Sequence, residues 1–157
     1  MNEKISAIHM EDLVPIIREV LETGSEFRLY PRGRSMLPTI VEGQDSVMLA
    51  KPTEVAVWDA VLYQRANGQY VLHRICRVRG GQLWFAGDAQ DVREGPLPAS
   101  CVFAYVTAVR RKDKLVTPGA PLWRLFSGPW LWLLGRRQRV LHLYGRLRPH
   151  LRQKTEE

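Results

Sequence analysis

The first part of the chain combines one helical pattern with short strand patterns. Apolar residues recur at helical spacing from Met10 to Glu22, with charged residues at the other positions, which predicts an amphipathic helix. Gly24 provides a stop signal directly after it. Residues 26–30 then alternate between apolar and polar side chains, and residues 46–50 form an apolar run, so both segments are predicted strands. We expect the helix to pack against the sheet that these strands begin.

The middle of the chain has the pattern of a meander, in which short strands are joined by tight turns. Asn67-Gly68 is a strong hairpin signal, and Gly80-Gly81 provides a second tight turn. The predicted strands around these turns are residues 60–65, 69–78, 82–86 and 102–109. One leading helix followed by short strands and frequent turns predicts a mainly β domain.

The C-terminal third differs from the rest of the chain in composition. Residues 117–135 hold three of the five tryptophans, and arginines follow as far as Arg152. Residues 107–157 carry 12 Lys and Arg against 3 Asp and Glu, whereas residues 1–106 carry 11 against 13. The excess of positive charge behind the net charge of +7 therefore lies in residues 107–157, which points to an anionic partner surface.

We therefore divide the chain into a β domain, residues 1–110, and a basic, tryptophan-rich helical appendage, residues 111–157. Indoles beside arginines are typical of a membrane interface, and residues 121–148 are the candidate segment for peripheral contact with anionic lipid. The alternative, which the sequence supports equally, is that these side chains cover an apolar edge of the β domain. Nucleic acid is not expected as a partner, because no recognition motif accompanies the arginines.

The composition also limits which cellular location and which cofactors can be expected. Cys76 and Cys101 show neither a metal-ligand spacing nor a disulfide framework, and we expect no metal and no cofactor. The N-terminal segment lacks the apolar core of a signal peptide, and no apolar run reaches the length of a membrane span. The expected location is the cytoplasm, at the inner face of the membrane if the appendage binds lipid.

The candidate chemistry begins in the segment PRGRSMLPTIVEGQD, residues 31–45. Gly33 permits close approach of backbone and Pro38 stops a helix, so Ser35 between them should lie on a stiff, exposed turn. Serine is common in turns for local hydrogen-bonding reasons, and a purely structural serine is the simpler interpretation on composition alone. As a nucleophile, Ser35 would need a neighbouring base.

His73 is the one histidine within the predicted strands, in the return strand of the Asn67-Gly68 hairpin, whereas His9 lies before the first helix. Strand alternation places it on the same face as Val71 and Ile75. A histidine on an apolar face is usually a core residue, so this interpretation stands beside a role as general base. The hairpin contains no lysine that would serve instead.

Together these motifs resemble the conserved boxes of the signal peptidase I clan of serine peptidases, which includes the self-cleaving repressors. The run Ser35-Met36-Leu37-Pro38-Thr39 after Gly33 matches the clan's pattern G-x-S-M-x-P-T, with Gly43-Gln44-Asp45 one residue longer than the usual Gly-Asp pair. The run His73-Arg74-Ile75 resembles the histidine-base branch, similar to the endoplasmic-reticulum type. The segment Phe85-Ala86-Gly87-Asp88 resembles the acidic box of the clan.

The resemblance covers about residues 27–109 and implies both a fold and an activity. The implied fold is a coiled β-sheet or partly open barrel, and the implied activity is that of a serine endopeptidase acting on a peptide or protein precursor. Ser35 would attack the carbonyl carbon with His73 as base, and a carboxylate would orient the imidazole. Asp88 is the first choice for that carboxylate and Asp91 the second.

Within the same resemblance, Met36 and Pro38 beside the nucleophile are assigned to substrate binding. Two other functions remain open. A catalytically inactive peptide-binding module would keep the same fold without turnover. A self-cleaving regulator ranks last, because only about 30 residues precede Ser35, too few for a typical DNA-binding domain.

Overall fold

The computed structural model describes residues 9–133, 135–137, 139–140 and 142–143, so the predicted tail beyond residue 143 lies outside the described residues. The elements, in chain order, are α1 (Met10–Glu22), β1 (Phe27–Leu29), β2 (Asp45–Ala50), β3 (Ala60–Gln64), β4 (Tyr70–Arg79), β5 (Gln82–Ala86), β6 (Glu94–Pro98), the 3-10 helix η1 (Ala99–Cys101), β7 (Val102–Arg111), β8 (Lys114–Val116), α2 (Pro121–Ser127) and α3 (Pro129–Trp132).

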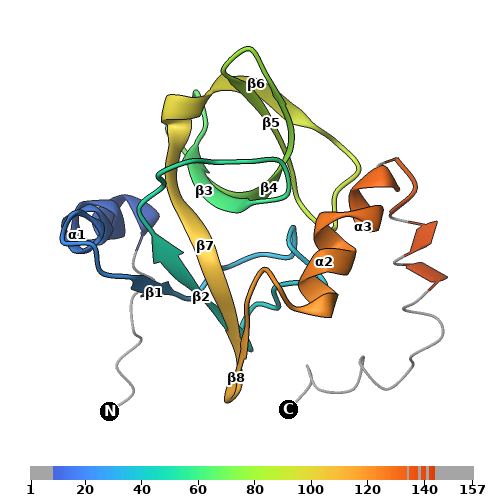
Figure 1. Cartoon of the computed structure of the whole chain (residues 1–157), viewed down its shortest axis with the longest axis horizontal. Coiled ribbons are helices and arrows are strands. Elements are labelled where there is room, and N and C mark those ends of the chain that lie inside the picture. Colours follow the sequence, from blue (N-terminus) through green and yellow to red (C-terminus); the bar gives the residue numbers. More distant parts are fainter. Residues whose placement is uncertain (1–8, 134, 138, 141, 144–157) are drawn as a thin grey trace.

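The strands form one curled antiparallel sheet (Figure 1). Its order is β1-β2-β7-β3-β4-β5-β6, with β8 attached to β7. The long strand β7 is the centre of the sheet, because it pairs with β2, β3 and β8. Among the described residues the end strands β1 and β6 do not pair with each other, so the sheet stays open. The predicted mainly β fold with a short N-terminal helix and a C-terminal helical segment is confirmed.

Local sequence explains the two features that position the candidate site. Helix α1 has the predicted bounds, and Val14, Ile17 and Leu21 form its buried stripe. The β3–β4 hairpin turns at Gly68, whose φ of +86° is a conformation that favours glycine. Its register pairs Val61 with His73, so the predicted candidate base lies in the middle of the sheet.

Strands β6 and β8 are not predicted by the sequence pattern. Strand β6 contains a Gly-Pro pair in the run EGPLP, which is atypical of a strand, and it lies at the edge of the sheet, where proline is tolerated. Strand β8 has three residues and forms a short hairpin with the end of β7. β8 lies within residues 111–157 and adds to the sheet, so the sheet extends past residue 110.

The core has two parts, one on each face of the sheet. The larger part joins α1 to the sheet and to α2, through Ile17, Leu49, Leu62, Ala104 and Trp123 among others. The smaller part, on the other face, consists of Val61, Tyr63, Ile75, Leu83 and Phe85. The rings of Tyr63 and Phe85 stack in it with centroids 3.8 Å apart.

In the view of Figure 1, α1 lies to the left of β2 and β7, and α2 and α3 lie to their right. The indole of Trp123 is 3% exposed and packs in the larger core, and the indole of Trp130 is also buried. These two tryptophans cover the β domain, as the second interpretation of the appendage expects. Within the described part of the chain, no helix has the length and apolar character needed to cross a membrane. Contact of residues 121–148 with anionic lipid stays a prediction.

Candidate active site

Ser35 lies in the turn of residues 33–40 between β1 and β2, which will be called the serine turn, and apolar side chains anchor this turn in the core. Backbone hydrogen bonds run from Leu37 to the carbonyl of Arg34 (3.2 Å) and from Ile40 to the carbonyl of Met36 (2.9 Å). Met36 and Ile40 are buried, whereas Ser35 is half-buried. The turn is therefore held from the inside while the serine remains at the edge of the core.

The loop of residues 87–91, which follows β5, packs against the serine turn and will be called the aspartate loop. The backbone N–H of Ala89 donates to the carbonyl oxygen of Ser35 at 2.8 Å. A Cβ atom on Gly87 would lie 2.5 Å from that same oxygen, a distance that real Cβ atoms do not adopt. Glycine at position 87 is therefore needed for this close approach of two backbones.

Asp88 ties the serine turn to strand β4. Its carboxylate accepts hydrogen bonds from Arg74 Nε (2.9 Å) and Arg74 Nη2 (2.8 Å), and from Thr39 Oγ1 (2.6 Å). Asp88 and Arg74 are both fully buried, so this charged pair depends on its complete set of hydrogen bonds. Because Arg74 adjoins His73 and Thr39 belongs to the serine turn, Asp88 holds the strand of the candidate base against the turn of the candidate nucleophile.

His73 is buried, with 2% of its surface exposed. Burial lowers the pKa of its imidazole from 6.5 to about 4, with the charge of Arg65 acting in the same direction. The negative charges of Glu94 and Asp88 oppose this shift without reversing it. At neutral pH the ring is therefore neutral, which is the state in which an imidazole accepts a proton.

A chain of polar contacts holds the Nδ1 side of the His73 ring. Tyr63 Oη lies 3.2 Å from His73 Nδ1 and donates a hydrogen bond to Glu94 Oε2 at 2.7 Å. Arg65 in turn binds both oxygens of Glu94, through Nε at 2.5 Å and Nη2 at 2.9 Å. Burial raises the pKa of Glu94, but the hydrogen bonds from Arg65 and Tyr63 outweigh it and lower the pKa below its usual value. Burial, together with the Glu94 carboxylate, raises the pKa of Tyr63.

Ser35 and His73 line the same cavity, which has a volume of about 400 Å³. Its walls come from α1, the end of β1, the serine turn, the β3–β4 hairpin and the aspartate loop. The apolar lining residues include Met10, Leu13, Leu29, Pro31, Met36, Ile40, Leu62, Val71 and Leu72. The polar side chains around the cavity include Arg32, Arg65, Gln69 and Gln90. The structure thus brings the two predicted catalytic residues to one hollow, which apolar and polar side chains line in similar measure.

The two predicted supporting acids are occupied by other groups. The hydrogen bonds of the Asp88 carboxylate go to Arg74 and Thr39, as described above, and it acts on His73 by charge at longer range. Asp91 Oδ1 accepts hydrogen bonds from the backbone N–H groups of Gly135 (3.2 Å) and Arg137 (3.0 Å). Within the described residues, the polar side chains next to His73 Nδ1 are those of Tyr63 and Glu94.

The two predicted substrate-binding residues differ in position. Met36 is buried in the core and also lines the cavity with Ser35. Pro38 follows a cis peptide bond and does not line the cavity among the described residues. The carbonyl of Pro38 accepts a hydrogen bond from Arg111 Nη2 at 3.4 Å, and the same nitrogen forms an ion pair with Asp45 at 2.6 Å. In this structure Pro38 helps to shape the turn.

The residues that the sequence analysis missed are Tyr63, Arg65 and Glu94. Tyr63 lies on the same strand face as Val61, which pairs with His73. Strand alternation therefore indicates that Tyr63 and His73 lie on one face of the hairpin. Glu94 belongs to the edge strand β6, where nothing in the sequence pattern indicates a strand. Its approach to Tyr63 depends on the pairing of β6 with β5.

The C-terminal segment fastens the aspartate loop. Trp130 Nε1 donates a hydrogen bond to the backbone carbonyl of Asp88 at 2.6 Å. The guanidinium of Arg137, which is fully buried, donates to the carbonyls of Gly87 (2.9 Å), Gln90 (3.3 Å) and Trp130 (3.0 Å). Trp130 and Arg137, which belong to the appendage, therefore stabilise the loop that packs against the serine turn.

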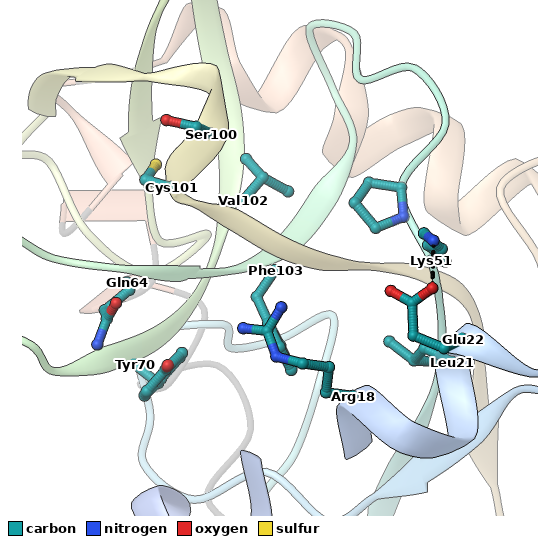
Figure 2. Close-up of a pocket in the computed structure, with 11 residues that line it drawn as sticks. Arg18, Leu21, Glu22, Lys51, Gln64, Tyr70, Ser100, Cys101, Val102 and Phe103 are labelled. Carbon is teal, nitrogen blue, oxygen red and sulfur yellow. Dashed lines mark hydrogen bonds and ion pairs between the residues drawn. The ribbon is translucent and has the colours of Figure 1, made fainter. Parts of the chain in front are cut away.

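A second cavity, of about 230 Å³, lies between α1 and the starts of β4 and β7 (Figure 2). It holds Lys51, the lysine that most closely precedes the β3–β4 hairpin in sequence. Lys51 forms an ion pair with Glu22 at 2.6 Å, while Arg18 lies over the ring of Phe103 (Figure 2). Among the described residues no lysine lines the cavity of Ser35, so His73 is the basic side chain available there for general-base chemistry.

Comparison of the chain with protein-family models, with curated proteins and with solved structures finds no match.

Proposed function

We propose that the protein is a serine endopeptidase similar to the histidine-base branch of the signal peptidase I clan, and that it cleaves a peptide or protein precursor. Ser35 is the nucleophile and His73 the general base. The observation that carries this proposal is that these two side chains, distant in sequence, line one cavity. The order of the serine, histidine and Gly-Asp motifs along the chain supports it independently.

In the proposed mechanism, Ser35 Oγ attacks the carbonyl carbon of the scissile peptide bond while the neutral His73 ring accepts the hydroxyl proton. The tetrahedral intermediate collapses when the imidazolium gives that proton to the leaving amine, which leaves an acyl group on Ser35. Water then attacks the acyl carbon while His73 takes one of its protons, and His73 returns that proton to Ser35 Oγ as the acyl–oxygen bond breaks and the acid product leaves. The backbone N–H of Ser35 is the proposed donor to the oxyanion.

The surroundings of His73 suit a base that is charged only briefly. The ring is neutral at rest because burial lowers its pKa to about 4. When it takes up the proton from Ser35, the Glu94 carboxylate lies 3.9 Å from Nδ1, and the charge of Asp88 adds to the stabilisation. An opposite charge at this distance in a buried site favours the imidazolium that forms during the reaction.

The proposed substrate binds in an extended conformation. Within the described residues, strand β1 pairs with β2 on one side only, so its other edge is available for main-chain hydrogen bonds to a peptide. Strand β1 ends at Leu29, which lines the cavity beside Ser35. The walls of that cavity combine apolar and polar side chains, and their apolar part favours an apolar side chain next to the scissile bond.

The test is cleavage of a peptide pool by the purified protein, with products identified by mass spectrometry. We expect cleavage that is lost in Ser35→Ala and in His73→Ala. Ser100→Ala is the matched control, because Ser100 is exposed and lines the other cavity (Figure 2). Cleavage that persists in Ser35→Ala would overturn the proposal, and peptide binding without any cleavage by the wild type would establish the alternative of an inactive peptide-binding module.

A further inference from the structure

We infer that Glu94, acting through Tyr63, is the positioning residue that fixes the tautomer of His73 and leaves Nε2 as the proton acceptor. The catalytic meaning of this inference rests on the proposed function, whereas the tautomer itself is a property of the folded protein. The inference assigns to Glu94 the supporting role that the sequence assigned to Asp88 or Asp91.

The tautomer follows from a count of protons along the chain of contacts. The hydroxyl of Tyr63 has one proton to donate, and an ionised carboxylate has none. Glu94 accepts hydrogen bonds from Arg65 on both of its oxygens, an arrangement that holds it in the ionised form. The Tyr63 proton therefore points to Glu94 Oε2, at 2.7 Å.

With its proton committed to Glu94, Tyr63 presents a lone pair to His73. The atom that faces this lone pair is Nδ1, at 3.2 Å, so Nδ1 must carry the ring proton for a hydrogen bond to form. In a neutral imidazole the other nitrogen, Nε2, is then unprotonated. Nε2 is thus the ring atom able to take the proton of Ser35.

The geometry also explains why Asp88 does not fill this role. Its two carboxylate oxygens accept hydrogen bonds from Arg74 and Thr39. If Asp88 turned towards His73 instead, the buried guanidinium of Arg74 would lose its charged partner. The charged groups that face His73 are Glu94 from β6, Arg65 directly after β3 and Asp88 from the aspartate loop. Of these three, the Glu94 carboxylate is the one that reaches the Nδ1 side of the ring, through Tyr63.

The direct test is the tautomer of His73, read from the ¹⁵N chemical shifts of its ring nitrogens in the full-length protein at neutral pH. Comparison with His73→Gln assigns the signals. We expect the Nδ1–H form in the wild type and a shift of population to the Nε2–H form in Tyr63→Phe, which removes the acceptor. An Nε2–H ring in the wild type, or a tautomer population unchanged in Tyr63→Phe, would overturn the inference.

A second variant keeps the inference testable if Tyr63→Phe does not fold. In Glu94→Gln the new amide N–H can donate to Tyr63 and free the hydroxyl proton to point at Nδ1, so the Nε2–H form should again gain population. Glu54→Gln is the matched control, because it makes the same charge change at an exposed position. An unchanged tautomer in Glu94→Gln would overturn the inference.

The catalytic consequence is read separately, from the rate at which a fluorophosphonate probe acylates Ser35 as a function of pH. Glu94→Gln removes the carboxylate that raises the pKa of His73 and leaves the opposing charge of Arg65, so the acidic limb of the rate profile should move to lower pH. We also expect the rate on the plateau to fall at least tenfold. An Nδ1–H tautomer in a wild type that the probe does not label would remove the proposed function and leave the positioning of the ring intact, so the two failures are distinguishable.

Discussion

The carbonyl oxygen of Ser35 lies where a side chain on Gly87 would have to go, at 2.5 Å from the ideal Cβ position. The same oxygen accepts the N–H of Ala89, so the aspartate loop and the serine turn meet backbone to backbone. The position of the candidate nucleophile is thus set by a second loop that lies far along the sequence.

Gly87→Ala should therefore displace the serine turn. Backbone that must move to admit a methyl group costs about 1–3 kcal/mol in a packed site, and we expect a loss of stability in this range together with slower acylation of Ser35. Gly119→Ala is the matched control, since a Cβ there meets no neighbouring atom. Urea denaturation and the rate of probe labelling measure both effects, and equal behaviour of the two variants would contradict the described contact.

Asp88→Asn tests the link between Thr39 and Arg74. The substitution leaves a fully buried guanidinium without its charged partner, which typically destabilises a protein by about 3–5 kcal/mol. Asp113→Asn changes the same charge at an exposed turn and should leave the free energy of unfolding nearly unchanged. A small effect of Asp88→Asn in urea denaturation would show that Arg74 finds another partner.

Stability should depend on pH through His73. Its pKa is depressed to about 4 in the folded protein, so the unfolded chain binds a proton that the folded chain excludes as the pH falls below 6.5. The free energy of unfolding should therefore decrease between pH 7.5 and pH 4.5, with His73 contributing roughly 2–3 kcal/mol of the loss. His73→Gln lacks this titration, so its stability should fall by that much less over the same interval; identical pH profiles would contradict the depressed pKa.

The sequence predicts the frame of the site but not all of its contacts. Asn67-Gly68 sets the hairpin turn and thereby places His73 in the sheet, and the turn around Ser35 is visible in its glycine and proline. The resemblance predicts Asp88 as the partner of His73, whereas in the structure its carboxylate binds Arg74. A fully buried arginine requires a carboxylate partner, but the burial of Arg74 is visible only in the structure.

The contacts that sequence could not predict depend on tertiary pairing. Glu94 reaches Tyr63 because an edge strand with a Gly-Pro pair joins β5. Trp130 and Arg137 reach the aspartate loop through the fold of the C-terminal segment over the sheet. Their composition favours a membrane interface and a covering role equally. The structure shows Trp130 and Arg137 in contact with the aspartate loop, and contact with lipid stays a prediction.

Trp130→Phe tests the support that the C-terminal segment gives to the site. The variant keeps an aromatic ring but loses the indole hydrogen bond to the carbonyl of Asp88, worth about 0.5–1.5 kcal/mol in a typical case. We expect this loss of stability together with slower probe labelling of Ser35. Trp58→Phe, at a partly exposed indole, serves as the control, and an equal response of the two variants would argue against a link between segment and site.

The most direct test of the account is the site of covalent modification by a fluorophosphonate probe, in which the serine oxygen bonds to phosphorus as fluoride leaves. After digestion, mass spectrometry should locate the adduct on Ser35 in the wild type and find it lost or strongly reduced in His73→Gln. Labelling at another residue, or labelling of Ser35 that is as fast in His73→Gln as in the wild type, would contradict the pairing of Ser35 with His73.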